Sequence, residues 1–282
     1  MRRFIFGTTL SSVLLLSLSG VNGEPNANPE QDLASKIHAL ETPDGIRFAL
    51  LGEKPEAPAP TLLVLALDAE QTLMNPVYRR CGNQLAPQGF LCFSVDLPCH
   101  GSQCRADEPG GLPGWRKRID SGDNPMIELS VRLKKVLDYL IDNHYTDPQR
   151  VVACGTSRGG FAALHFAAAD PRVRCVAAYS PVTDLRALQE FQGVQSELEQ
   201  QLRLTNQVAK LVDRDVWIMI GDCDNRVDTD RAIEFARHLS AEAARQKIPG
   251  RVELHVCPSS GHHTPVEAEE QSAAWMTRQL KK

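Results

Sequence analysis

One short segment, Gly155-Thr156-Ser157-Arg158-Gly159, restricts the fold of this chain more than any other stretch of its sequence. It follows a short apolar run at 151–154, and a helical run of small residues at 160–169 comes directly after it. A strand, a sharp turn and a helix in this order lift a serine out of a parallel sheet as an exposed nucleophile. The pattern therefore predicts that Ser157 is a nucleophile; the alternative is a structural turn that happens to carry a serine.

Apolar runs and amphipathic segments alternate along the rest of the chain. Runs typical of strands buried on both faces lie at 62–67, 90–95, 151–154, 173–178, 216–220 and 252–257, and a first strand is expected at 46–51. Helical patterns separate the runs, the longest of them beginning at Pro125. This alternation predicts an α/β fold, a mostly parallel sheet of about eight strands with helices on both faces.

The loop after 216–220 holds the candidate acids. Parallel strands joined by right-handed crossovers end at one edge of the sheet, so catalytic residues are expected in loops that directly follow strands. This loop contains Asp222, Asp224 and Asp228. Asp224 is the predicted acid, because Asp222 lies close to the strand end and Asp228 is placed to cap the next helix. A solvated acidic turn is the alternative for all three.

Two histidines, His262 and His263, follow the last apolar run. A serine hydroxyl is a poor nucleophile until a base takes its proton, and that base works best when a carboxylate orients it. His262 is the predicted base and His263 the alternative, since the sequence does not show which ring points inward. His100 also follows a strand but precedes the serine, and His165 is expected to pack within its helix.

The order Ser157, Asp224, His262 resembles that of the α/β-hydrolases. The segment 155–161, the form Gly221-x-x-Asp224-x-x-Val227 and Gly261-His262 are similar to the catalytic domain of the prolyl oligopeptidase and dienelactone hydrolase branches. The segment 96–101 resembles one that follows the preceding strand in this superfamily, and it is interpreted as structural. The resemblance covers essentially the whole chain after its N-terminal region and implies the α/β-hydrolase fold with serine hydrolase activity.

The resemblance also implies an oxyanion hole made of two backbone N–H groups. One belongs to Arg158, the residue after the nucleophile, and the other to the loop after 62–67. The family often has His-Gly in that loop, where this chain has Asp68-Ala69-Glu70. Ala69 is the predicted second donor, because a backbone N–H needs no particular side chain. An anionic Asp68 would oppose a developing oxyanion unless it points away or pairs with Arg158.

Two segments are candidate walls of a substrate site. In the segment 99–124, Trp115 and Arg116 are predicted to bind a substrate with an anionic group; the alternative is a basic turn anchored by one tryptophan. The segment 182–213, expected to be mostly helical, is either a small lid or a crossover helix. The expected reaction is cleavage of carboxylic ester or related acyl bonds through an acyl-enzyme. Cleavage of small peptides is the second hypothesis, and an inactive binding protein on the same fold is the third.

The N-terminus predicts export to the periplasm or the extracellular space. Two arginines precede the moderately long apolar segment 4–18, and small residues at 21–23 offer a cleavage point. The expected division is a signal peptide at 1–23, a tether with a short helix (31–40) at 24–45, and a catalytic domain at 46–282. The alternatives for the apolar segment are an uncleaved membrane anchor and an internal strand.

Composition and cysteine spacing limit the partners. The formal net charge of −4, from 31 basic and 35 acidic residues, offers no surface for a polyanion, so nucleic acid is not expected. Export would permit disulfides among the eight cysteines, with Cys99–Cys104 and Cys223–Cys257 as candidate pairs. No Cys or His spacing is typical of zinc, so neither a metal nor another cofactor is expected. A small ester or short peptide is the expected ligand, with no stable membrane insertion after signal cleavage.

Overall fold

A single mixed sheet organises the protein, whose computed structural model describes residues 36–265 and 267–281. In this part of the chain the sheet has eight strands in the order β1-β2-β4-β3-β5-β6-β7-β8. From β4 to β8 neighbouring strands are parallel, while β2 is antiparallel to both β1 and β4. The strands are β1 (Ile37–Glu41), β2 (Arg47–Leu51), β3 (Ala59–Leu65), β4 (Leu91–Ser94), β5 (Thr146–Thr156), β6 (Val173–Tyr179), β7 (Asp215–Gly221) and β8 (Val252–Cys257).

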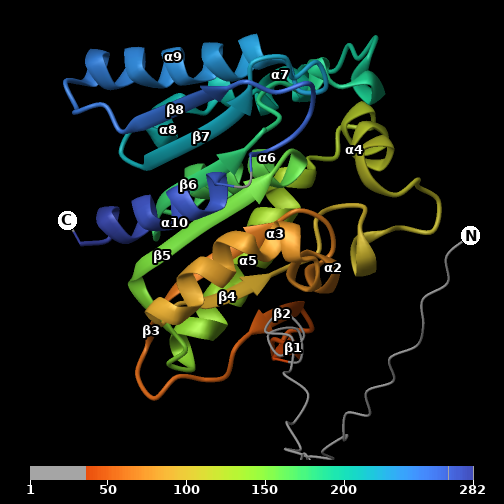
Figure 1. Ribbon diagram of the computed structural model, residues 1–282. Helices are drawn as coiled ribbons and strands as arrows, with labels where there is room; N and C mark the ends of the chain where they lie inside the picture. Colours follow the sequence, from red (N-terminus) through yellow and green to blue (C-terminus); the bar gives the residue numbers. More distant parts are fainter. Residues whose placement is uncertain (1–35, 266, 282) are drawn as a thin grey trace, which may run out of the picture.

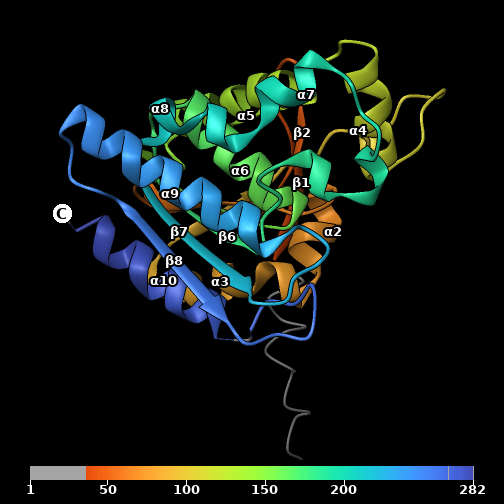
Figure 2. The ribbon, with the colours of Figure 1, turned by 90° about the horizontal axis from the view of Figure 1, so that it is seen from above.

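Helices cover both faces of the sheet, as Figures 1 and 2 show. Residues of α4, α5, α6 and α9 pack on one face, while residues of α2, α3 and α10 pack on the other. Successive strand residues serve opposite faces: Leu63 belongs to the first core and Leu62 to the second. The α-helices are α2 (Ala69–Met74), α3 (Pro76–Leu85), α4 (Gly111–Asp120), α5 (Pro125–Asp142), α6 (Arg158–Ala169), α7 (Glu197–Leu202), α8 (Val208–Leu211), α9 (Thr229–Gln246) and α10 (Ala268–Gln279).

The prediction of a short helix at 31–40 is wrong for residues 36–40, the part that the structure describes. Ile37–Glu41 is strand β1, which pairs residue by residue with β2. This pairing satisfies backbone groups of β2 that would otherwise form an open sheet edge. The sheet therefore begins before residue 46, the expected start of the catalytic domain. The predicted signal peptide at 1–23 and the tether up to residue 35 lie outside the described residues.

The segment 182–213 is not the mostly helical stretch that its composition suggests. It is divided into the short helices α7 and α8 and three 3₁₀ turns. Gly193 has a φ of +70°, which ends one turn, and the side chain of Ser196 accepts a hydrogen bond from the Leu198 N–H to start the next helix. Local caps and turns outweigh helix propensity here, so a single crossover helix does not form.

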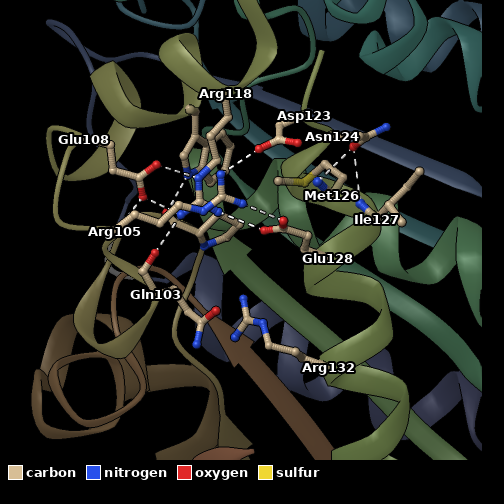
Figure 3. Close-up of polar contacts among 12 residues, drawn as sticks. Gln103, Arg105, Glu108, Arg118, Asp123, Asn124, Met126, Ile127, Glu128 and Arg132 are labelled. Carbon is tan, nitrogen blue, oxygen red and sulfur yellow. Dashed lines mark hydrogen bonds and ion pairs between the residues drawn. The ribbon is translucent and has the colours of Figure 1, made fainter. Parts of the chain in front are cut away.

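Ion pairs, one of them buried, join the loop before α4 to α4 itself and to α5 (Figure 3). The Arg118 side chain is only 3% exposed and binds the carboxylates of Glu108 and Glu128, the latter at 2.9 Å. Arg105 binds Glu128 at 2.7 Å and Asp123 at 2.6 Å. Cations that appear free in the sequence are thus neutralised within the segment, which makes it a structural element.

The Arg118–Glu108 pair predicts acid sensitivity. The hydrogen bond from Arg118 outweighs burial and lowers the pKa of Glu108 from its ordinary 4.5 to about 2. Between these values the unfolded carboxyl binds a proton that the folded one rejects, so the stability from this pair is present above pH 4.5 and lost as the pH falls toward 2. We expect Glu108→Gln to unfold at lower urea concentration at neutral pH and to lose less stability on acidification. Glu56→Gln, at an exposed site, is the control; equal acid dependence of Glu108→Gln and the parent would contradict the expectation.

All eight cysteines lie in the described part of the chain, and all are free thiols. The candidate pairs Cys99–Cys104 and Cys223–Cys257 are therefore not formed. Cys99 is buried while Cys104 is exposed, and the Cys257 thiol donates to the Ile220 carbonyl at 3.4 Å. Among residues 36–265 and 267–281, no helix is long and apolar enough to cross a membrane.

Candidate active site

Ser157 lies on the sharp turn between β5 and α6. Its φ of 55° and ψ of −115° are unusual for a residue with a side chain, and such conformations typically cost about 1–3 kcal/mol. Two contacts from neighbouring segments hold the turn: the Ser157 N–H donates to the Tyr179 carbonyl at 2.9 Å, and the Ser157 carbonyl accepts the Val182 N–H at 3.1 Å. The serine is thereby presented at the carboxyl edge of the sheet.

The glycines of the Gly155–Gly159 segment allow this turn to pack backbone against backbone. A Cβ atom on Gly159 would lie 1.9 Å from the Leu65 carbonyl oxygen, and one on Gly155 would lie 2.3 Å from the Gly159 carbonyl carbon. Both distances are far inside van der Waals contact. The start of α6 can approach β3 and β5 only because these two side chains are absent.

Gly159→Ala is accordingly expected to destabilise the fold by about 3 kcal/mol or more, since a rigid backbone carbonyl, rather than a flexible side chain, would have to move. Urea unfolding measures the loss. Gly250→Ala is the matched control, because nothing lies within 4 Å of a Cβ atom placed there. A Gly159→Ala protein as stable as the control would contradict the close approach of α6 to β3.

Asp224 and His262 form the polar contact that characterises the site. The Asp224 Oδ2 lies 2.8 Å from the His262 Nδ1, and the Asp224 side chain is fully buried. Burial opposes a charge on Asp224, but hydrogen bonds from His262 and from the N–H groups of Val227 and Arg226 prevail and lower its pKa. A carboxylate acceptor at Nδ1 places the imidazole proton there and leaves Nε2 free to accept a proton.

The other two aspartates of this loop have different partners. Asp222 Oδ1 accepts the Ser259 N–H at 2.8 Å, which ties the β7 loop to the β8 loop. Asp228 caps α9 by accepting the Asp230 N–H at 3.0 Å. Of the three carboxylates, the one that contacts an imidazole is Asp224.

Ser157 and His262 both line a cavity of about 460 Å³. His263 also lines it, but the described hydrogen bonds of His263 are made by its backbone. No trio of His, Cys, Asp or Glu suited to a metal ion occurs within 36–265 and 267–281. The remaining lining residues are Ala66, Val77, Tyr78, Arg80, Thr156, Arg158, Ser180, Thr264 and Glu269.

Ala69 is wrong as the second oxyanion donor. Its N–H donates to Asp96 Oδ1 at 2.8 Å, and the residue lines a separate cavity. The preceding Leu67 N–H is also occupied, by Thr72 Oγ1 at 3.0 Å. Asp68 caps α2 through the Gln71 N–H, so its carboxylate serves that helix and does not pair with Arg158. Ala66 is the residue of this loop that lines the Ser157 cavity.

Trp115 and Arg116 are also wrong as substrate-binding residues, because neither lines the Ser157 cavity. A helix, α4, forms where a loop was expected, and it turns Trp115 into the core, where its Nε1 donates to the Pro98 carbonyl at 2.6 Å. Arg116 pairs with Asp120 at 2.6 Å and donates to the Glu190 carbonyl. Both residues hold α4 in place.

The cavity contains residues that sequence reasoning missed. Arg80 of α3 pairs with Glu269 of α10 at 3.3 Å, and burial raises the pKa of the Glu269 carboxyl. Ser180, with a φ of 40°, follows β6. Of these three residues, Ser180 is the one that directly follows a strand, which is a signal the sequence offers. Arg80 and Glu269 come from helices and carry no motif.

Comparison with known proteins identifies the family of the chain. Residues 132–282, more than half of the chain, match the prolyl oligopeptidase family. The chain belongs to the prolyl oligopeptidase family. The matched residues include Ser157, Asp224 and His262. The chain has the expected α/β-hydrolase fold, and its membership of this family agrees with the expected serine hydrolase activity.

Relatives of this family member are esterases and peptidases. Esterase FrsA of Serratia proteamaculans is 34% identical over 137 residues, which are 48% of this chain but only 28% of that protein. The structure of TT1662 from Thermus thermophilus is similar at a TM-score of 0.63 and 19% identity, with 87% of this chain and 99% of that chain covered. A puromycin-hydrolyzing peptidase of Mycobacterium tuberculosis also reaches a TM-score of 0.63, at 15% identity, with 86% of this chain and 39% of that chain covered. At these identities the solved structures show the fold alone.

Proposed function

We propose that this serine hydrolase cleaves carboxylic esters through Ser157, His262 and Asp224 with an acyl-enzyme intermediate. The observation that carries the proposal is the 2.8 Å contact between Asp224 and His262 beside the cavity that holds the strained Ser157 turn. Strain at a turn is maintained where surrounding contacts hold it, and such turns gather at active sites. A cavity of about 460 Å³ is suited to a small acyl substrate.

In the proposed reaction, Ser157 Oγ attacks the carbonyl carbon while His262 Nε2 takes the hydroxyl proton. Asp224 keeps the imidazole in the tautomer that accepts this proton and stabilises the imidazolium that forms. His262 then protonates the leaving alcohol, and the acyl group remains on Ser157. A water molecule deprotonated by His262 releases the acid and restores the serine.

The oxyanion is held by the N–H of Arg158 and, in place of Ala69, by the N–H of Ala66. Arg158 is the first residue of α6, where backbone N–H groups lack partners within the helix. Ala66 lines the cavity, and its Cα is near Gly159: a Cβ on that glycine would lie 2.9 Å away. Each such donor typically contributes about 3–4 kcal/mol to lowering the barrier.

A second candidate function is cleavage of short peptides. The family match to the prolyl oligopeptidases favours it, since the same serine and base can attack an amide. Comparing kcat/KM for p-nitrophenyl acetate and butyrate with that for aminoacyl p-nitroanilides separates the two. Higher values for the anilides, after allowance for their intrinsic reactivity, would contradict the esterase assignment. A folded protein that turns over neither class and is not labelled by a fluorophosphonate would contradict both.

Export is proposed as well, on the basis of the two arginines and the apolar segment in residues 1–23. The natural host should release a mature protein whose first residue follows the small residues at 21–23. N-terminal sequencing of the protein from the extracytoplasmic fraction tests this. Recovery of a chain that still begins at Met1 would contradict it.

A further inference from the structure

Arg158 lines the active-site cavity, and besides its backbone N–H it carries a positively charged side chain. Its side chain donates from Nη1 to His100 Nε2 at 3.2 Å, and no carboxylate of the described residues forms an ion pair with it. Two neighbouring arginines differ in this respect. Arg80 is paired with Glu269, and Arg226 binds both oxygens of Glu190, at 2.6 and 2.8 Å.

His100 holds Arg158 without neutralising it. The His100 Nδ1 is 2.9 Å from the Pro98 carbonyl, which can only accept, so Nδ1 carries the proton and Nε2 accepts from Arg158. Burial, together with the Arg158 charge, lowers the pKa of His100, so the ring stays neutral at physiological pH. Burial also lowers the pKa of Arg158, which shows that water only partly solvates the unpaired guanidinium. An anion entering the cavity would relieve that cost.

The Arg158 guanidinium contacts the loop after β4, across β5 from the loop that carries His262. His100 and Gly111 follow β4, and a Cβ on Gly111 would lie 3.3 Å from Arg158 Nη1. His262 follows β8, and β5 with Ser157 lies between β4 and β8. Because His262 must protonate the leaving alcohol, that alcohol occupies the β8 side. The acyl chain is left to extend toward β4 and Arg158.

We propose that Arg158 binds a free carboxylate on the acyl part of the substrate, so that the preferred substrates are half-esters of dicarboxylic acids. This inference rests on the proposed esterase function. Guanidinium and carboxylate match in charge and shape, since two parallel N–H groups can meet two oxygens. The neutral His100 orients the guanidinium while leaving its remaining N–H groups to the ligand.

Two p-nitrophenyl esters test the proposal: the mono-p-nitrophenyl ester of adipic acid, with its free carboxylate, and the same compound with that carboxyl group methylated. We expect wild type to have the higher kcat/KM for the free acid. Arg158→Gln should lower the ratio of the two kcat/KM values by about 10–100-fold, the usual effect of a charged hydrogen bond. His100→Glu should lower the ratio similarly, because a new carboxylate would neutralise Arg158. Arg237→Gln, at an exposed site on α9, should leave the ratio unchanged.

Equal kcat/KM for the two esters in wild type would overturn the proposal, even if neither variant folds. Equal losses on both esters in Arg158→Gln would also overturn it, because the guanidinium would then act on the reacting oxygen. Both results leave the proposed function intact, since the methylated ester is still hydrolysed. Failure of wild type to hydrolyse either ester, together with no fluorophosphonate labelling of Ser157, would instead contradict the proposed function.

Discussion

Replacing Ser157 with alanine is expected to lower kcat for ester hydrolysis by about 10⁶-fold, the usual loss when the nucleophile of a serine triad is removed. The acyl-enzyme cannot form without Oγ, so only the oxyanion hole and the binding pocket would still act on the substrate. Steady-state assays and fluorophosphonate labelling, read by mass spectrometry, measure the effect. The label should be found on Ser157 in wild type and be absent from Ser157→Ala.

A second serine in the same cavity provides the matched control. Ser180 also has a positive φ, but its hydroxyl donates to the His263 carbonyl at 3.3 Å. Ser180→Ala should therefore still be labelled at Ser157. If the label disappeared in Ser180→Ala and persisted in Ser157→Ala, the nucleophile would be Ser180 and the assignment of Ser157 would be wrong.

Asp224→Asn should have the next largest effect, a loss of about 10⁴-fold in kcat, as in other triads whose acid is made an amide. The amide can present an N–H to His262 Nδ1, which would favour the tautomer whose proton is on Nε2 and which cannot accept from Ser157. Circular dichroism should show an unchanged fold, because asparagine has nearly the shape of aspartate. The kcat of the purified variant gives the result.

The neighbouring aspartates supply controls for this assignment. Asp222→Asn alters the contact with Ser259, and Asp228→Asn retains a residue that caps helices well. Both should keep most of the activity that Asp224→Asn loses. Similar losses in all three variants would mean that the loop as a whole, rather than Asp224, supports the base.

Much of the fold could be predicted because strand patterning is local. Runs such as 62–67 and 216–220 are buried on both faces, and they appear in the structure as β3 and β7, with small shifts of their ends. β1 could not be predicted in this way. Its residues are partly exposed, and its strand conformation depends on pairing with β2. The break-up of 182–213 was missed because caps and turns there outweigh a helix-favouring composition.

The candidate site likewise has residues that local sequence patterns predicted and residues whose roles depend on tertiary contacts. Ser157, Asp224 and His262 each follow a strand, so their order along the chain was enough to propose them. The side-chain roles of Trp115 and Arg116 were missed because α4 formed where glycine and proline suggested a loop. Trp115 donates to the Pro98 carbonyl and Arg116 to the Glu190 carbonyl, and a local pattern shows neither partner.

The sequence by itself determined which strands the candidate residues Ser157, Asp224 and His262 follow, and it determined the turn at Ser157. Both depend on apolar periodicity and turn glycines, which act between residues close in the chain. The tertiary structure alone decided which N–H groups and which charges remain available. The Ala69 N–H is taken by Asp96, Arg80 and Arg226 are neutralised, and Arg158 is left with a neutral partner. The reason is physical: hydrogen bonds and ion pairs are saturated by whichever groups folding brings within reach, and distance along the chain does not reveal those groups.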